Sequence, residues 1–335
     1  MHPHPDSQLI PRLEIAVQAR NSLIEQHPNN AFRLFNGFYE GYPDLVVDQY
    51  ASSLVLYSYL RDQQGSQAML ESVQSFFQGA LPHINVILQK FRFAESQNLR
   101  RGVVSYGSIL PDWIEEFHVK YAIDLRLNQD ASFYLDTRQL RKWLLEYSRD
   151  KRVLNLFAYT GSLGIAALAG AAQQVDQADL KQKFLQLALH SVSLNNFELS
   201  RMSLHVADFF TQVAYYKQQG TLFNTVILDA PFFSITKKGS VDLARQTVRL
   251  VNKVRPLVSD GGHLVVVNNA LFLSGKDFLD SIQALCQDGY LKIEQIVPAP
   301  EDITGYPQTI VQGPPVDPSP FNHPTKILVL SVKRK

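Results

Sequence analysis

Cysteine is nearly absent from this sequence, which contains Cys286 alone among 335 residues. A single thiol cannot close an intramolecular disulfide or supply the several ligands of a cysteine metal site, so both are excluded. Net charge is nearly absent too, because 32 Lys and Arg residues balance 31 Asp and Glu residues to leave +1. The chain as a whole therefore exerts no long-range attraction on nucleic acid or an anionic membrane, and any basic surface must be local.

The sequence also lacks a long apolar run. No stretch approaches the roughly 18 apolar residues of a membrane-spanning helix, and the N-terminal residues have no signal-peptide core. We therefore expect a cytoplasmic protein with no membrane contact. His2 and His4 lie among prolines near the N-terminus, and we predict no metal site from them or from any other part of the chain.

Hydrophobic periodicity divides the chain into three predicted segments. Residues 1–27 carry apolar side chains at helical spacing and form an N-terminal helix. Residues 28–127 form a small α+β domain with the order strand-strand-helix-strand-strand. Residues 128–335 alternate between strands and helices, the pattern of an α/β, Rossmann-like doubly wound fold with a parallel sheet. Ligands of such sheets bind at the carboxyl ends of the strands.

A glycine turn stands where the first strand of this fold meets its first helix, in VLNLFAYTGSLGIAAL (residues 153–168). The dinucleotide fingerprint G-x-G-x-x-G would place three glycines there. This chain keeps Gly161 and Gly164 but has Tyr159 at the position of the first glycine. The tyrosine obstructs the close approach of a pyrophosphate. A nucleoside without a phosphate therefore fits this turn better than NAD does.

Three carboxylates follow three successive predicted strands, namely Asp179, Asp208 and Asp229. A single Asp at such a place is often only a helix N-cap or a turn residue. Three in succession favour a nucleoside site instead. Asp179 lies about 20 residues past the glycine turn, where an acidic residue accepts hydrogen bonds from ribose. Asp208 would accept from an adenine amino group, with the ring face of Phe209 beside it. S-adenosylmethionine (AdoMet) is the common ligand of this kind.

Several stretches carry a family resemblance. Residues 153–197, with ASFYLDTRQLR before them and FNTVILDAPFFSITKKGSVDLARQ after them, resemble the class I AdoMet-dependent methyltransferases that modify bases of large-subunit ribosomal RNA. That family includes cytosine-C5 and guanine-N7 enzymes. Residues 32–60 resemble the central domain that these enzymes place before the catalytic one. The resemblance implies a Rossmann-like methyltransferase domain preceded by a small α+β domain, with RNA as the partner.

The resemblance also implies residue roles. An AdoMet site would be lined by the strand ends and the loop before the first strand, through Tyr134, Asp136, Arg138, Phe157, Tyr159, Gly161, Asp179, Asp208 and Phe209. Asp229 and Pro231 occupy the family's Asp-Pro-Pro motif, which faces both the methyl group and the target base. Ala230 replaces the first proline of that motif, so the backbone is expected to be looser there.

The absence of a cysteine at one strand end bears on whether the methyl acceptor is a carbon or a nitrogen atom. Transfer to carbon 5 of cytosine needs a cysteine nucleophile, and relatives carry it after the strand that here ends in Asn268 and Asn269. Cys286 lies far along the next helix and reads as a core thiol. A nitrogen acceptor is therefore favoured. Asn268 or Asn269 would bond the base edge, and Phe232 or Phe233 would stack on a flipped base; loop capping and burial are the alternative roles.

Two other functions remain open at this point: an NAD-linked oxidoreductase with the same fold, and a non-catalytic AdoMet-binding protein that interacts with RNA, for which Ala230 is the warning. A methyltransferase of small molecules or proteins is disfavoured by the first domain. Basic side chains that would contact RNA lie in both predicted domains, at Arg92, Arg100, Arg101, Lys237, Lys238, Arg245 and Arg249.

Overall fold

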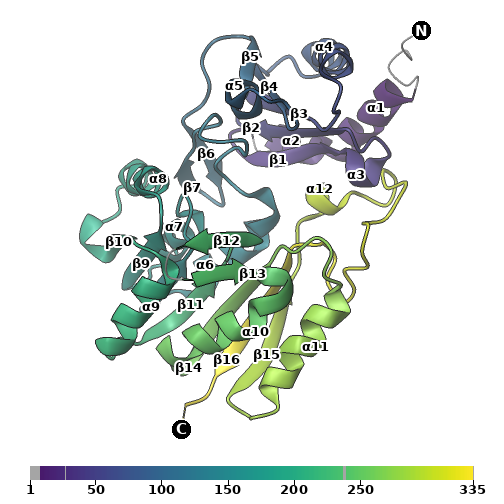
Figure 1. The fold of residues 1–335 in the computed structure, drawn as a ribbon. Coiled ribbons are helices and arrows are strands. Elements are labelled where there is room, and N and C mark those ends of the chain that lie inside the picture. Colours follow the sequence, from purple (N-terminus) through teal and green to yellow (C-terminus); the bar gives the residue numbers. More distant parts are fainter. Residues whose placement is uncertain (1–7, 27, 237–238, 335) are drawn as a thin grey trace. The chain divides into compact units, whose positions relative to one another are not determined.

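The computed structural model describes residues 8–26, 28–236 and 239–334. Contacts divide it into two compact units (Figure 1). Unit 1 comprises Met1–Leu135 with Pro300–Gly313, and unit 2 comprises Asp136–Ala299 with Pro314–Lys335. These units differ from the predicted segments in two respects. The predicted N-terminal helix is part of unit 1, as are residues 128–135 and 300–313, which the sequence assigned to the second domain.

Unit 1 is built around a five-stranded sheet in the order β1-β2-β3-β4-β5, in which β3 and β4 are parallel and the other neighbours antiparallel. A separate hairpin pairs β6 with β7. The elements are α1 (Leu9–Ala19), α2 (Asn21–Gln26), β1 (Ala31–Asn36), α3 (Gly37–Glu40), β2 (Leu45–Tyr50), β3 (Ser53–Ser58), α4 (Gln63–Ala80), β4 (Val86–Phe91), α5 (Gln97–Arg101), β5 (Val103–Tyr106), β6 (Trp113–Glu116), β7 (Val119–Ala122) and α12 (Glu301–Thr304).

The core of unit 1 follows from the period of its apolar residues. Strands β2, β3 and β4 are buried along their whole length. Helix α4 begins where Asp62 accepts a hydrogen bond from the Gly65 amide, and it buries Met69, Val73 and Phe77 on one face. Helix α1 adds its own apolar stripe to the same core. The amphipathic N-terminal helix of the sequence therefore finds its partner within unit 1.

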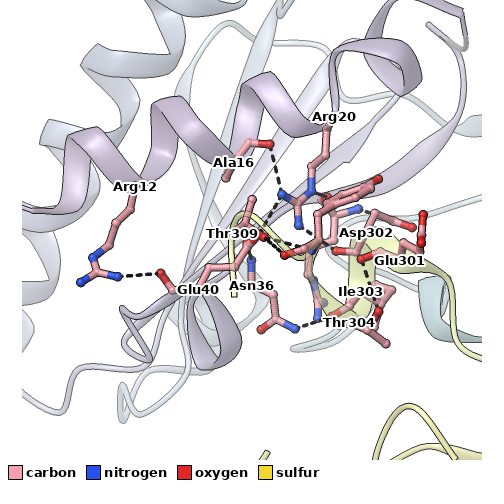
Figure 2. Close-up of polar contacts among 12 residues, drawn as sticks. Arg12, Ala16, Arg20, Asn36, Glu40, Glu301, Asp302, Ile303, Thr304 and Thr309 are labelled. Carbon is pink, nitrogen blue, oxygen red and sulfur yellow. Dashed lines mark hydrogen bonds and ion pairs between the residues drawn. The ribbon is translucent and has the colours of Figure 1, made fainter. Parts of the chain in front are cut away.

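A buried arginine joins α1 to the rest of unit 1 (Figure 2). The Arg20 guanidinium is fully buried and pairs with Glu40, with 2.9 Å between Nη1 and Oε1. It also donates to the backbone carbonyls of Arg33 at 2.6 Å and Asp302 at 3.0 Å. A buried guanidinium is tolerated only when its charge and its N–H groups are matched in this way.

The segment 300–313 belongs to unit 1 because it completes buried hydrogen bonds there (Figure 2). Asn36 Nδ2 donates to the Ile303 carbonyl at 2.7 Å, and the Asp302 carboxylate accepts from the Arg33 amide at 2.9 Å. Buried polar groups need hydrogen-bond partners. Residues 300–313 supply these partners to β1, which is far away in the sequence. The chain consequently leaves unit 2 after one strand and re-enters it before the next.

Unit 2 is a seven-stranded sheet in the order β10-β9-β8-β11-β14-β16-β15. The elements are η1 (Leu135–Thr137), α6 (Arg138–Tyr147), β8 (Arg152–Leu156), α7 (Ser162–Ala169), β9 (Gln174–Asp179), α8 (Gln182–Leu194), η2 (Leu199–Arg201), β10 (Met202–Val206), α9 (Phe209–Gln218), β11 (Phe223–Leu228), β12 (Phe233–Thr236), β13 (Gly239–Asp242), α10 (Leu243–Val254), η3 (Arg255–Leu257), β14 (Val258–Asn268), α11 (Gly275–Cys286), β15 (Leu291–Val297) and β16 (Lys326–Val332). In this part of the chain, as in unit 1, no described helix is long and apolar enough to cross a membrane.

The α/β, Rossmann-like prediction is confirmed, with one correction to the sheet. Strand β16 runs antiparallel to both neighbours, β14 and β15. The reason is the connection before it. Parallel neighbours need a crossover helix that packs on the sheet, whereas the residues between β15 and β16 detour through unit 1. Strand β15 and the β12–β13 hairpin were not predicted, and Lys237 and Lys238 lie outside the described residues.

Candidate functional site

The strand order of unit 2 reverses between β8 and β11, which pair side by side at the middle of the sheet. Ligands of doubly wound sheets bind beyond the carboxyl ends of the strands at such a point. The register pairs Leu156 of β8 with Ala178 of β9 and with Leu228 of β11. The next residue of each strand is Phe157, Asp179 and Asp229. Three residues predicted for the site are therefore neighbours at one edge of the sheet.

The loop after β8 has an unusual backbone. Phe157, Tyr159 and Gly161 all have positive φ, at 58°, 51° and 82°. The left-handed region is strained for the two aromatic residues and open to glycine. Such strain persists where the surroundings hold it, commonly at ligand sites. Here the carboxylate of Asp179 holds it, since Oδ2 accepts the Tyr159 amide at 2.9 Å.

The glycines of this turn are needed for close packing as well. A Cβ on Gly161 would lie 2.6 Å from the Cβ of Ala188, and one on Gly164 would lie 2.4 Å from the Cδ of Gln177. Gln177 is fully buried on β9 and accepts a hydrogen bond from Asn155. The start of α7 therefore lies directly against the sheet, which brings the turn close to the strand ends.

Asp179 is half-buried at the end of β9, and its two oxygens accept separate amides. Oδ2 accepts from Tyr159 and Oδ1 accepts from Lys181, each at 2.9 Å. Burial raises its pKa above the ordinary value, and the amide bonds oppose that rise. Each carboxylate oxygen has a further lone pair. The group is thus fixed in orientation and still able to accept hydrogen bonds from a ligand.

Asp208 is the N-cap of α9, as the alternative interpretation allowed. Its Oδ1 accepts from the amides of Phe210 and Thr211 at 2.9 Å and 3.4 Å. Phe209 is buried, and its ring stacks on Phe157 with 4.8 Å between centroids and 21° between planes. Phe157 therefore covers one face of the Phe209 ring, and contact between Phe209 and adenine stays a prediction.

Two carboxylates of unit 2 interact electrostatically. Asp229 follows β11, and Asp136 precedes α6 and accepts a hydrogen bond from the Thr325 hydroxyl at 2.7 Å. Burial, and then the negative charge of Asp136, raise the pKa of Asp229 to about 7. A cationic ligand would favour the ionised form of Asp229.

The Asp-Ala-Pro motif is well supported despite its missing proline. Ala230 is fully buried in the core of unit 2. The backbone beyond it is tied to α10, because the Leu243 amide donates to the Phe232 carbonyl at 3.1 Å. Pro231 is exposed, and the rings of Phe232 and Phe233 are 49% and 57% exposed. The expected looseness is therefore offset by this bond, and the two rings are accessible.

Asn268 is not available to a ligand, so its predicted catalytic role is corrected. Its side chain is fully buried, and its Nδ2 donates to the Leu243 carbonyl at 3.2 Å and to the Thr247 hydroxyl at 3.0 Å. Its Oδ1 accepts the Ala270 amide at 2.9 Å. A buried amide must be satisfied by the protein, and this one caps its own loop. Asn269 is exposed and keeps the possibility of contact.

Two further predicted cofactor residues, Tyr134 and Arg138, belong to different units. Tyr134 belongs to unit 1, where its hydroxyl donates to Asp130 Oδ2 at 3.4 Å. Arg138 is buried at the first turn of α6, in unit 2. Leu271 and Phe272, which the sequence analysis did not single out, follow β14 and are 42% and 75% exposed. Their signal was two large apolar residues in a loop, NALFLS, that begins at a strand end.

Cys286 is the last residue of α11, which starts after the carboxyl end of β14 and leads into β15. A helix of 12 residues is about 18 Å long. Cys286 therefore lies toward the opposite edge of the sheet from the candidate site. Burial raises the pKa of its thiol, which makes it a poorer nucleophile.

Comparison with known proteins assigns the class. The model of the S-adenosylmethionine-dependent methyltransferase family matches residues 86–306. This is well over half of the chain, and the chain belongs to that family. The family assignment leaves an NAD-linked oxidoreductase without support.

Individual relatives point to ribosomal RNA. Ribosomal RNA large subunit methyltransferase I of Vibrio cholerae is 32% identical over 76% of this chain and 65% of its own length. The same enzyme of Aeromonas salmonicida is 30% identical over 76% of this chain and 64% of its own. YwbD of Bacillus subtilis, a candidate enzyme of the same kind, is 29% identical over 89% and 76%. The chain thus spans just under two thirds of the methyltransferase I relatives.

Solved structures show the same fold. SMU.776 in complex with SAH has a TM-score of 0.83 at 22% identity, covering 96% of this chain and 80% of that one. The tRNA m1G37 methyltransferase of M. jannaschii has a TM-score of 0.54 at 12% identity, covering 98% and 80%. At these identities the likeness concerns the fold alone.

Proposed function

We propose that this chain transfers a methyl group from AdoMet to a base of large-subunit ribosomal RNA in the cytoplasm, with a nitrogen as the acceptor. The names of its relatives support the RNA class. The observation that carries the cofactor site is the carboxylate pair Asp136 and Asp229, beside a strained loop and a fixed Asp179. AdoMet carries a sulfonium and an ammonium charge, which suit such a pair.

Residues at the strand ends of unit 2 would bind different parts of AdoMet. AdoMet supplies a methyl group on a positively charged sulfur. The loop of Phe157, Tyr159 and Gly161 would hold its methionine and ribose part, and Asp179 would accept from the ribose hydroxyls. Asp208 keeps one oxygen outside the α9 cap for the adenine amino group. Positioning of the base against the methyl group then contributes most of the rate, because little covalent chemistry is needed from the protein.

The base would be held outside Pro231. Exposed rings of Phe232 and Phe233 offer stacking surfaces, and an extruded base is usually read by stacking and by hydrogen bonds to its edge. The acceptor nitrogen attacks with its lone pair, and the bond from methyl carbon to sulfur breaks. Where that nitrogen bears a proton, the ionised Asp229 would accept it. Carbon 5 of cytosine is disfavoured because Cys286 is distant from this edge.

Calorimetric titration with AdoMet and with NAD, followed by mass spectrometry of ribosomal RNA from a deletion strain, tests this function. We expect AdoMet to bind and NAD not to bind. Asp179→Ala should weaken AdoMet binding by about 1 to 3 kcal/mol, the cost of unpaired hydrogen-bonding groups. The exposed Asp150 is a matched control, since Asp150→Ala removes the same charge elsewhere in unit 2. Binding of NAD alone, or a complete set of RNA methylations in the deletion strain, would overturn the proposal.

A further inference from the structure

A basic hollow lies in unit 1, and all of its lining residues belong to that unit. It has a volume of about 400 Å³ and is lined by Gln97, Asn98, Arg101 and Arg126. The lining contains two guanidinium groups and two amides but no carboxylate. Such a set offers many N–H donors and a positive charge, so it suits an anion with several oxygen acceptors.

The two arginines are free to bind. Across the described residues, no side chain or carbonyl engages the Arg101 guanidinium, which is half-buried at the end of α5. Arg126 is exposed, and one of its N–H groups donates to Asn98 Oδ1 at 3.1 Å. That bond holds the guanidinium at the hollow and leaves its other donors available. The Asp124 carboxylate accepts the Arg126 amide at 2.8 Å and so shapes the turn before it.

The two other arginines predicted to contact RNA in this domain each donate hydrogen bonds within the protein through Nη1. Arg92 Nη1 donates to the Gln129 carbonyl at 2.8 Å and to Asp130 Oδ1 at 3.1 Å. Arg100 Nη1 donates to the carbonyls of Ala94 and Glu95 at 2.7 Å and 2.8 Å. Of the three arginines predicted to contact RNA in this domain, Arg101 is the one whose guanidinium has no hydrogen-bond partner among the described residues.

An exposed aromatic residue, Phe93, precedes the first lining residue of this hollow by four positions in the sequence. Phe93 is 50% exposed and directly precedes the residue whose carbonyl Arg100 ties to α5. The Arg61 guanidinium lies over its ring, 4.8 Å from the centroid. An exposed aromatic residue with arginines around it is the usual means of binding single-stranded nucleic acid, through base stacking and phosphate contacts.

We propose that the hollow of Gln97, Asn98, Arg101 and Arg126 binds the phosphodiester backbone of single-stranded RNA, and that Phe93 stacks on a base of the same strand. The proposal rests on the proposed function for the identity of the partner. It assigns RNA contact to residues of unit 1, in addition to the predicted base contacts of unit 2. With an overall charge of only +1, a local basic surface of this kind is what RNA binding requires.

Fluorescence anisotropy with a short labelled single-stranded RNA, repeated over a range of salt concentrations, tests the assignment on the full chain. Arg101→Gln with Arg126→Gln should flatten the plot of log affinity against log salt by about 1.4, since each lost phosphate contact removes about 0.7. Phe93→Ala should weaken binding by about 5-fold to 150-fold with the salt slope unchanged, and Phe93→Tyr should restore it. Arg149→Gln is the matched control, because Arg149 is exposed in unit 2.

AdoMet affinity, measured by calorimetry on every variant, separates this proposal from the function itself. Unaltered RNA affinity and salt slope in the Arg101 and Arg126 variants would overturn the surface, even if the wild type methylates RNA. Equal binding of a polyglutamate peptide to the wild type would overturn RNA as the occupant. Loss of RNA binding with unchanged AdoMet affinity supports the proposal, and it does so even if no methyl transfer is found.

Discussion

The pH dependence of cofactor binding should report the ionisation of Asp229. Its pKa is raised to about 7 by burial and by the charge of Asp136. A cationic ligand favours the ionised form, so binding should lower this pKa and release a proton. With a pKa of about 7, roughly one tenth of the free protein is ionised at pH 6 and roughly nine tenths at pH 8. The affinity for AdoMet should therefore rise about tenfold over this interval.

Titration calorimetry at several pH values, in two buffers of different ionisation enthalpy, measures both the affinity and the proton count. At pH 7 we expect about half a proton to be released per AdoMet bound. Asp229→Asn should abolish the steep rise of AdoMet affinity with pH. The affinity of this variant at the same pH values also serves as the correction for titration of AdoMet itself. Asp136→Asn should move the profile to lower pH, because removal of the like charge lowers the pKa of Asp229.

AdoMet affinity should rise with pH, whereas the contribution of Asp229 to the free energy of unfolding should fall with pH. Its folded pKa lies above the ordinary value of 3.8, so the unfolded chain loses this proton first as pH rises. The contribution of Asp229 to stability is then present below about pH 4 and is lost as the pH rises through about 7.

Identical pH profiles of AdoMet affinity in the wild type and Asp229→Asn would refute the assignment of the carboxylate pair to the cationic ligand.

Three further outcomes are expected. Glu40→Gln should lower the free energy of unfolding in urea by about 3 kcal/mol, because it leaves the buried Arg20 without its counter-charge; a change below about 1 kcal/mol would contradict this. Gly164→Ala should cost about 1 to 3 kcal/mol in thermal unfolding, since its Cβ would lie 2.4 Å from a buried side chain, whereas Gly79→Ala, with nothing within 4 Å, should be tolerated. Cys286→Ser should keep methyl transfer to RNA, and covalent trapping of that cysteine by a fluoropyrimidine RNA would show otherwise.

Local pattern in the sequence was enough to determine the class of fold and the edge of the sheet at which several predicted site residues gather. The alternation of strand and helix periods predicts the doubly wound sheet, because residues at those periods must bury one face or both. The glycine turn with Gly161 and the carboxylates after successive strands, such as Asp179 and Asp229, mark one edge of that sheet. The fold prediction is confirmed, and these residues share one edge because the carboxyl ends of neighbouring parallel strands meet there.

Tertiary structure decided which of the marked side chains are free. Asn268 ends a strand as expected, yet its amide is used up by α10, 25 and 21 residues away. Arg20 falls within the predicted N-terminal helix, where nothing in the sequence marks it as buried, but its guanidinium reaches the Asp302 carbonyl, 282 residues along the chain. Arg92 and Arg101 look alike in sequence, and only the folded chain supplies acceptors to the first and leaves the second open. Hydrogen-bond partners are set by contacts between distant segments, and local periodicity carries no record of them.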